Sequence, residues 1–340
     1  MYIMSQRDSS LRLRRKISML IVQKFGGSSL ADLERLRRAA GICAGARRKE
    51  HDTVVVVSAM GDSTDDLLDI AHRISPCPPL RELDALLCCG EQQSAALMAI
   101  MLESMGVSAR SFSGWQAGIH TDSRHFSADI LSIKPERIRS ALSQAQVAVV
   151  SGFQGVDGDG DMNTLGRGGS DTSAVSLALA LGADRCEIYT DVDGIYTADP
   201  RLISKATLLE KIDYRDMLRL ACRGSQVLHR RCVSLAMEKK LDLRLMSSFR
   251  DLPGTALAFL EDEERPDIAG ITRDETEGSL SIVGKAADAA LGVRLSQLLS
   301  SGGFEAESMQ LYEGCVSFTL EPYKLIPAMQ LIHGFLFAEN

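Results

Sequence analysis

The sequence predicts an α/β protein with a mainly parallel central sheet that helices cover on both faces. Three runs, at 19–25, 53–58 and 147–151, are apolar almost throughout, as expected of strands that are buried on both sides. Segments with helical periodicity, at 64–74 and 80–104, alternate with these strands. Strands that alternate with helices are typical of a layered α/β fold with a parallel sheet.

The same alternation continues in order along the chain. The strand at 19–25 runs into two glycines, and Ser28 or Ser29 is the expected cap of the helix that follows. Leu30, Leu33 and Leu36 would form the apolar face of that helix. Further elements are expected as strands at 108–112 and 186–190 and as helices at 136–144 and 174–183.

Length, composition and charge limit the class of protein. The 340 residues suffice for about two domains, and 45% apolar with 24% charged residues is usual for a soluble globular protein. A net charge of −7 and the lack of a basic face with interleaved aromatic residues argue against nucleic-acid binding. The sequence has no apolar run near the ~20 residues of a membrane span, so no membrane partner is expected.

The cysteines and the N-terminus bear on location. The 8 cysteines are scattered and form no CxxC pair, so we expect free thiols in a reduced, cytoplasmic compartment and no metal-binding residues. Residues 1–17 are rich in arginine and serine, and we interpret them as an N-terminal extension rather than a transit peptide.

Unusual polar residues follow the ends of the expected strands. Lys24, Ser58 and the turns at 151–171 and 190–201 all occupy such positions. In a parallel sheet these ends lie at one edge, where ligands of open α/β sheets bind. The sequence therefore predicts a site at this edge.

Several motifs at this edge have a functional and a structural interpretation. Lys24 with Gly26 and Gly27 could hold phosphates, or could form a tight turn beside a solvated lysine. The hydroxyl groups of the 58–64 segment could bind a small polar substrate, while Asp62 or Ser63 could equally cap a helix. GxxxxGK[ST] and GxGxxG are both absent from the sequence, which disfavours a P-loop NTPase and a Rossmann oxidoreductase.

Two carboxylate motifs have the same ambiguity. Glu91 could bind an ammonium group, although from the residues alone a first-turn partner of a helix dipole is favoured. Aspartates alternate with glycines at 157–161, but the spacing does not match a calcium loop, and we interpret the segment as a hairpin tip.

The segment 164–201 contains the strongest candidate set. Arg167 could grip a carboxylate in bidentate fashion, with Ser170 beside it. Asp171 could orient Lys24. These residues point to transfer of a phosphoryl group to a carboxylate, which is already ionised at neutral pH and needs no base.

The ordered motifs resemble the aspartate kinases of the amino acid kinase superfamily. The resemblance covers about residues 19–258 and is carried by VQKFGGSSLAD, VVVVSAMGDSTDDLLDIA, LLCCGEQQSAALMA, SFSGWQAGIHTD, the long segment VVSGFQGVDGDGDMNTLGRGGSDTSAVSLALALGADRCEIYTDVDGIYTADPR, and GSQVLHRRCVSLA. It implies a three-layer α/β/α catalytic domain at 19–258 that phosphorylates the β-carboxylate of L-aspartate with Mg-ATP, the first step towards lysine, threonine and methionine.

The resemblance also implies roles for single residues. Glu91 would bind the substrate ammonium group, against the interpretation from the residues alone, and Arg167 a substrate carboxylate. Lys24 and Asp171 would be catalytic. The other implied residues are Ser58, Thr64 and Ser170 for the substrate, and Gly26, Gly27, Ser28, Tyr189, Thr190, Asp191, Tyr196, Arg201, Gln226 and Val227 for ATP. The ion would be held mainly by the nucleotide phosphates.

The sequence departs from the family pattern at three places. The family's usual Gly-Gly-Thr is Gly26-Gly27-Ser28 in this sequence, and Gln226 stands where the family usually has a lysine. Beyond a charged linker at 261–266, the tail has room for one ACT-like unit where two are usual. We expect this βαββα-like unit, at 266–340, to pair two chains into a homodimer, because its sheet edge would otherwise be open.

The tail also bears on regulation and on alternatives. Ala289-Ala290 aligns with the usual Pro-Gly effector loop and Glu305 with an Asn, so weak or absent feedback by lysine or threonine is expected. Two other functions stay open: a different carboxylate or carbamate kinase of the superfamily, and a non-catalytic regulatory subunit that keeps the fold.

Overall fold

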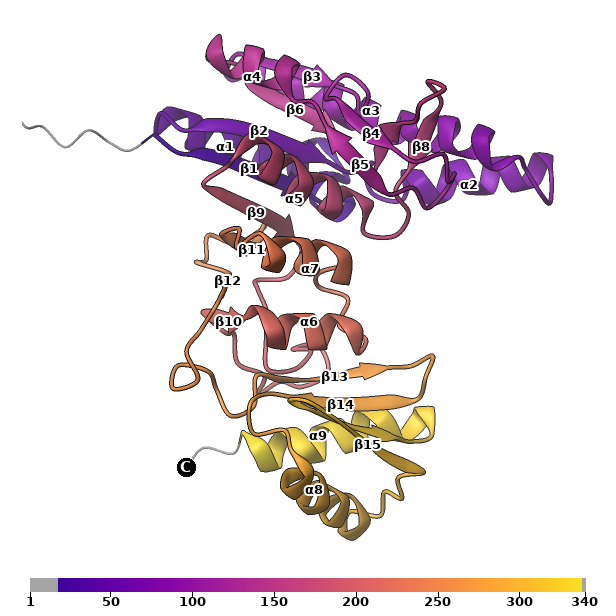
Figure 1. Cartoon of the computed structure of the whole chain (residues 1–340), viewed down its shortest axis with the longest axis vertical. Helices are drawn as coiled ribbons and strands as arrows, with labels where there is room; N and C mark the ends of the chain where they lie inside the picture. The colour runs from indigo at the N-terminus through magenta and orange to yellow at the C-terminus, as the bar shows by residue number, and fades with distance from the viewer. Residues whose placement is uncertain (1–17, 338–340) are drawn as a thin grey trace, which may run out of the picture.

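The protein has a mainly parallel sheet of eight strands at its centre (Figure 1). The computed structural model describes residues 18–337, so the prediction for residues 1–17 lies outside the described residues. Within this sheet the strands at 243–247 and 255–258 form the one antiparallel pair among the described residues, and the other neighbours are parallel, which confirms the predicted sheet. In spatial order the strands are β10 (Lys211–Asp213), β12 (Thr255–Ala258), β11 (Leu243–Ser247), β9 (Arg185–Thr190), β1 (Leu20–Phe25), β2 (Asp52–Val57), β6 (Val147–Ser151) and β3 (Ala109–Phe112).

Helices cover both faces of this sheet because side chains alternate along each strand. In β2, Val54 and Val56 pack into one apolar core, and Val55 and Val57 into the other. The second core is closed by α1 (Leu33–Arg48) and α3 (Leu80–Ser104). The first is closed by α4 (Glu136–Ser143), α5 (Gly169–Leu181) and α7 (Arg230–Glu238). A further helix, α2 (Ser63–Ile74), packs on α3.

The sequence did not predict a second small sheet that packs on α3. It contains, in order, β5 (Ile130–Ile133), β4 (Ile119–Thr121), β7 (Gln154–Val156) and β8 (Met162–Thr164). The antiparallel pair of β7 and β8 confirms the predicted hairpin tip at 157–161. Inside this turn the Asp157 carboxylate accepts the backbone N–H groups of Asp159 and Asp161.

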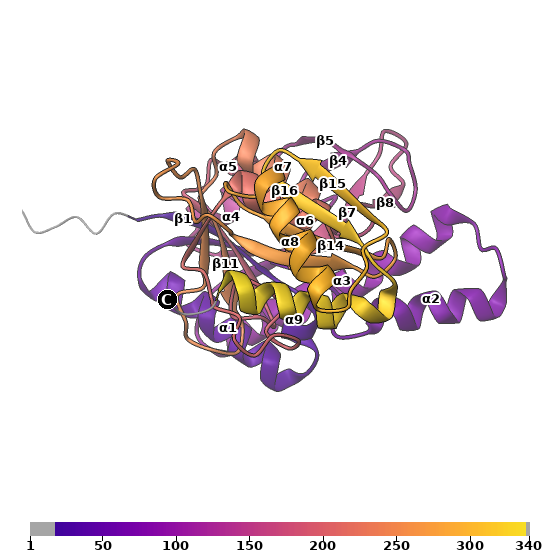
Figure 2. The same ribbon diagram turned by 90° about the horizontal axis from the view of Figure 1, so that it is seen from below.

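The tail forms an antiparallel sheet with two helices packed on it (Figure 2). Its order is ββαββα, one strand more than the βαββα-like unit that we expected, and the strand at 308–312 was missed because its mixed polar and apolar side chains form no continuous apolar run. The elements are β13 (Gly270–Asp274), β14 (Ser279–Val283), α8 (Ala289–Ser301), β15 (Ser308–Tyr312), β16 (Cys315–Thr319) and α9 (Leu325–Leu336), and the strand order is β13-β14-β16-β15.

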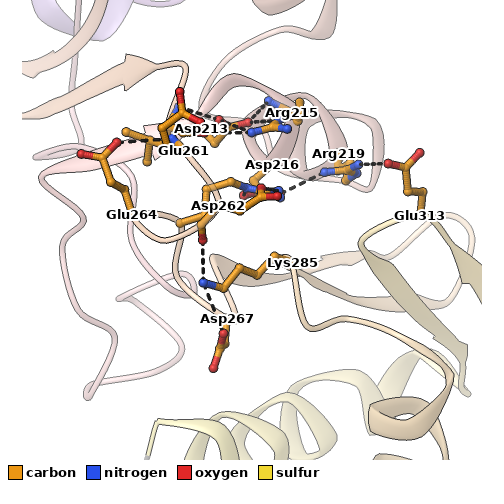
Figure 3. A network of polar contacts seen from close by, with 12 residues as sticks. Asp213, Arg215, Asp216, Arg219, Glu261, Asp262, Glu264, Asp267, Lys285 and Glu313 are labelled. Atoms are coloured by element: carbon orange, nitrogen blue, oxygen red, sulfur yellow. Dashed lines mark hydrogen bonds and ion pairs between the residues drawn. The ribbon is translucent and has the colours of Figure 1, made fainter.

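A buried ion cluster joins the tail to the rest of the molecule through α6 (Tyr214–Cys222) (Figure 3). Asp216 is fully buried, and its carboxylate pairs with Arg219 at 3.1 Å and with Arg265 at 2.8 Å. Arg219 also reaches Glu313, in the turn between β15 and β16. Packing is continuous across this junction, because residues 198–206 contribute to the apolar core of the tail. The division into 19–258 and 266–340 remains a prediction.

The first helix begins later than expected. Gly27–Leu30 is a short 3-10 helix, and α1 starts at Leu33 with Asp32 as its cap, accepting the Arg35 N–H at 2.8 Å. Ser29 is not a cap, since its hydroxyl bonds to Ser248. Leu33 is 65% exposed and does not belong to the apolar face.

Two other helices also differ from the expectations. Asp62 precedes α2 but makes no side-chain capping bond. α3 is long and apolar enough to cross a membrane, but half of its most apolar window is buried inside the molecule, as in a core helix.

Candidate functional site

Four parallel strands end side by side and bring the predicted site residues to one edge of the sheet. Backbone hydrogen bonds join the loops that follow them: Ser58 N–H donates to Phe25 O at 3.1 Å, and Gly152 N–H to Val57 O at 2.9 Å. On the other side, Gly26 N–H donates to Tyr189 O at 3.3 Å. The loops after β9, β1, β2 and β6 therefore form one continuous surface at this edge.

An ion pair lies at the centre of this edge. Lys24 Nζ lies 2.6 Å from Asp171 Oδ1, and both side chains are largely buried, at 12% and 13% exposure. Lys24 is on the same face of β1 as Val22, which packs in the core beside α5, so its chain points to the first turn of that helix. The contact with Asp171 holds the lysine ammonium group in place; the catalytic roles of both residues stay predictions.

The glycines after β1 have little space around them. A Cβ at Gly27 would lie 2.8 Å from Ala59 O, and one at Gly26 would lie 3.4 Å from Lys24 Nζ. Only glycine lets the loop after β1 pass this closely to the loop after β2. Ser28 is half-buried, and its carbonyl accepts the Arg35 side chain at 2.7 Å.

Glu91 is a buried carboxylate with one free oxygen. It lies in the middle of α3, not in a first turn, and is 3% exposed. Oε1 accepts the Ala59 N–H at 3.1 Å, whereas Oε2 is buried and has no partner within residues 18–337. Burial raises the pKa of Glu91 to about 7. Such a group favours a cationic partner, which would restore its ionised form.

The turn before α5 combines rigidity with an exposed cation. Gly168 has φ +71°, and a Cβ there would lie 2.4 Å from the His229 side chain. Ser170 is buried, and a Cβ at Gly152 would meet its hydroxyl at 2.9 Å. Arg167 is exposed, so its guanidinium is accessible to a carboxylate from solution.

The residues expected at the nucleotide lie after β9, but not all of them present side chains there. Tyr189 is buried, stacks on Phe25 with ring centres 4.7 Å apart, and donates its hydroxyl to Glu187. Only its backbone is therefore at the edge. Tyr196 donates to Asp193 at 3.3 Å. The remaining members are a half-buried Thr190, an exposed Asp191, and an exposed Arg201 paired with Asp199 at 2.8 Å.

The other predicted residues lie in nearby loops. Ser58 and Thr64 are half-buried, in the loop after β2 and in the first turn of α2. Gln226 is exposed and Val227 half-buried, in the loop between α6 and α7. This loop leads to His229, which caps α7 and lies against Gly168, so it adjoins the turn before α5.

Sequence reasoning missed several residues that shape the site. Ala59 provides the amide that holds Glu91, and Gly152 makes room for Ser170. Neither has a local signal. Asp84 lies seven residues before Glu91 on α3 and is fully buried, and this helical spacing could have drawn attention to it.

An open cavity of about 520 Å³ between α5, α6 and α7 shares no residue with the site.

The fold and the site define a class of protein. The profile of the amino acid kinase family matches residues 19–247, and the chain belongs to this family.

Curated relatives narrow the class. The chain is 49% identical over 269 residues to the aspartokinase of Mycobacterium tuberculosis, covering 78% of this chain and 64% of that relative. It is 44% identical over 288 residues to the aspartokinase of Thermus thermophilus, covering 85% and 71%. Within its family the chain therefore belongs with the aspartokinases. It spans less than two thirds of the length of the mycobacterial relatives.

Solved structures agree with this placement. An aspartate kinase from Synechocystis has a TM-score of 0.64 and 31% identity, covering 94% of this chain and 70% of that one. Escherichia coli aspartokinase III in complex with aspartate and ADP has a TM-score of 0.81, covering 94% and 100%. At 20% identity this second likeness shows the fold alone.

Proposed function

We propose that this protein transfers the γ-phosphoryl group of ATP to the β-carboxylate of L-aspartate, forming 4-phospho-L-aspartate. The observation that carries the proposal is Glu91, a buried carboxylate with one unpartnered oxygen, which accepts the Ala59 N–H in the loop after β2, at the same sheet edge as the Lys24–Asp171 pair. A substrate ammonium group supplies the missing partner. The identity to known aspartokinases, and the aspartate and ADP bound by the Escherichia coli enzyme of the same fold, support these substrates.

The acceptor would be held at both ends. Glu91 binds its ammonium group, and the exposed guanidinium of Arg167 binds the α-carboxylate in bidentate fashion. The hydroxyl groups of Ser58, Thr64 and Ser170 complete its hydrogen bonds. An acceptor of the wrong length would leave some of these polar groups without a hydrogen-bond partner. The site would therefore discriminate against acceptors that are shorter or longer than L-aspartate.

The reaction needs positioning and charge neutralisation rather than a base. One oxygen of the ionised β-carboxylate attacks the γ-phosphorus as the bond from that phosphorus to the β–γ bridging oxygen breaks, and the bridging oxygen leaves with its electron pair on ADP. No proton is transferred. Lys24, oriented by Asp171 at 2.6 Å, places a positive charge beside the transferred group as negative charge shifts to ADP.

The nucleotide would lie over the glycines after β1 and the segment 189–201. Gly26 and Gly27 let the phosphates approach the backbone closely, while Thr190, Asp191 and Tyr196 are at the nucleotide side. Bound Mg²⁺ would neutralise phosphate charge. Within residues 18–337 no group of three or more His, Cys, Asp or Glu side chains could hold an ion. In this proposal the phosphate oxygens of the nucleotide are the main ligands of the ion.

An assay across acceptors tests the proposal. ATP-dependent acyl phosphate formation, trapped with hydroxylamine, is measured with L-aspartate, L-glutamate and N-acetyl-L-glutamate. We expect turnover with L-aspartate well above the others. Turnover with glutamate but not aspartate would establish a different carboxylate kinase, and no turnover with any acceptor would favour a regulatory subunit.

We also propose a homodimer formed through the tail, in a cytoplasmic enzyme of lysine, threonine and methionine synthesis. In support, β15 is an edge strand whose five residues are all exposed, including Met309, Leu311 and Tyr312 at 39%, 46% and 44%. Apolar edge strands tend to pair with a second chain. A monomeric mass in light scattering at micromolar concentration would contradict the homodimer.

The expected weak feedback has its own test. Strong inhibition by millimolar lysine or threonine would contradict it.

A further inference from the structure

A second buried carboxylate lies on the same helix as Glu91 and has all its partners. Asp84 is fully buried and lies two turns earlier on the same face of α3. Its Oδ1 accepts the Thr164 hydroxyl at 2.6 Å. Its Oδ2 accepts from His125 Nδ1 at 2.8 Å, and both oxygens share the Phe126 N–H at 3.2 and 3.0 Å. A charged group this well satisfied holds its neighbours rigidly.

The hydrogen bonds of Asp84 stabilise the turn at His125 and Phe126. Phe126 has φ +66°, a left-handed conformation that is unfavourable for a non-glycine residue. Its N–H is the group that Asp84 accepts, so the carboxylate holds the strained turn in place. His125, the preceding residue, is 22% exposed and also lies close to Asn163 at 2.9 Å.

The same network leads directly to Arg167. Thr164 ends β8, and its carbonyl accepts the Ala128 N–H at 2.9 Å. Gly166 follows with φ +71°, and a Cβ there would lie 3.1 Å from Phe126 O. The backbone just before Arg167 is thus held from one side by Asp84 and the turn that Asp84 organises.

We propose that Asp84, His125 and Thr164 are positioning residues that set the distance between Arg167 and Glu91, and with it the length of the amino-acid acceptor. The proposal rests on the proposed function. Glu91 and Asp84 lie on the same face of α3. In this proposal Glu91 contacts the substrate directly, and Asp84 holds the backbone segment that leads to Arg167. When the hydrogen bonds of Asp84 are weakened, the distance between Arg167 and Glu91 is no longer fixed. The nucleotide-binding loop after β9 does not take part in these bonds and should not change.

Thr164→Val tests this with little change in volume. Loss of a hydrogen bond to a charged group predicts a rise of about ten-fold in KM for L-aspartate, with KM for ATP within about two-fold of wild type. Discrimination against L-glutamate should fall, and Thr164→Ser should restore both values. Thr53→Val is the matched control, since Thr53 is equally buried but bonds only to His51 O at the opposite end of β2.

Equal rises in both KM values, or an unchanged KM for aspartate, would overturn the proposal. His125→Gln serves as a second variant if Thr164→Val does not fold, with the same expected split. Hydrogen exchange of residues 162–168 gives a readout that needs no activity. If wild type does not phosphorylate aspartate, the proposed function fails, whereas the network fails if exchange in this segment is the same in Thr164→Val and wild type.

Discussion

Replacing Glu91 with glutamine should stabilise the protein while weakening substrate binding. The folded state holds the pKa of Glu91 at about 7, against an ordinary value of 4.5, because burial disfavours the charged form. Each pKa unit between the two states is worth ~1.4 kcal/mol. Ionised Glu91 therefore lowers the unfolding free energy by about 3 kcal/mol above pH 7.

The sign follows from proton binding. Between pH 4.5 and about 7 the folded protein keeps the Glu91 proton and the unfolded chain has lost it, so stability falls as pH rises. Glutamine has no such proton. The difference in unfolding free energy between Glu91→Gln and wild type should then grow from near zero at pH 4.5 to about 3 kcal/mol above pH 7, less a small loss from the weaker bond to the Ala59 N–H.

Denaturant unfolding at pH 5, 6, 7 and 8, without ligands, measures this difference. Glu82→Gln, an exposed position on the same helix, is the control and should show no such trend. The same variant should raise KM for aspartate, and added aspartate should raise its Tm less than that of wild type. A difference in unfolding free energy that stays flat across this pH range would refute the reasoning.

Three further predictions concern other parts of the molecule. Lys24→Met should lower kcat on the order of 10²–10³-fold with the fold retained by circular dichroism; an unchanged rate would argue for a non-catalytic role. Gly27→Ala should lower Tm and raise KM for ATP, because its Cβ would lie 2.8 Å from Ala59 O, and a neutral result would show that the loop can move. Asp216→Asn should destabilise by about 3–5 kcal/mol in denaturant unfolding, because it removes the buried charged partner of Arg265 and leaves only the exposed Asp262; a loss below about 1 kcal/mol would show that the cluster is dispensable.

The local pattern was sufficient where each signal is contained in one strand or helix. The apolar runs at 19–25, 53–58 and 147–151 identified the parallel sheet, since alternation and burial depend only on neighbouring residues. The ends of these runs also placed Lys24 and Ser58 at one edge of the sheet. The pattern failed for β4, β5 and β15, because short strands with polar or mixed side chains resemble loops in sequence.

Helix starts were misjudged for a similar reason. Ser28 and Ser29 fit the statistics of a cap, but a tertiary contact of Ser29 with Ser248 takes its hydroxyl, and Asp32 caps the helix instead. A bond between residues so far apart in sequence leaves no trace in either local pattern.

The sequence by itself determined the class of fold, the edge at which the site lies and the residues that gather there. Periodicity and strand-end chemistry are local properties, so a single chain displays them. Only the tertiary structure decided that Glu91 is buried with one oxygen unpartnered, that Asp171 pairs with Lys24 at 2.6 Å, and that Asp84 reaches Thr164. These are contacts between side chains from different elements, and burial and hydrogen-bond satisfaction exist only once those elements have packed.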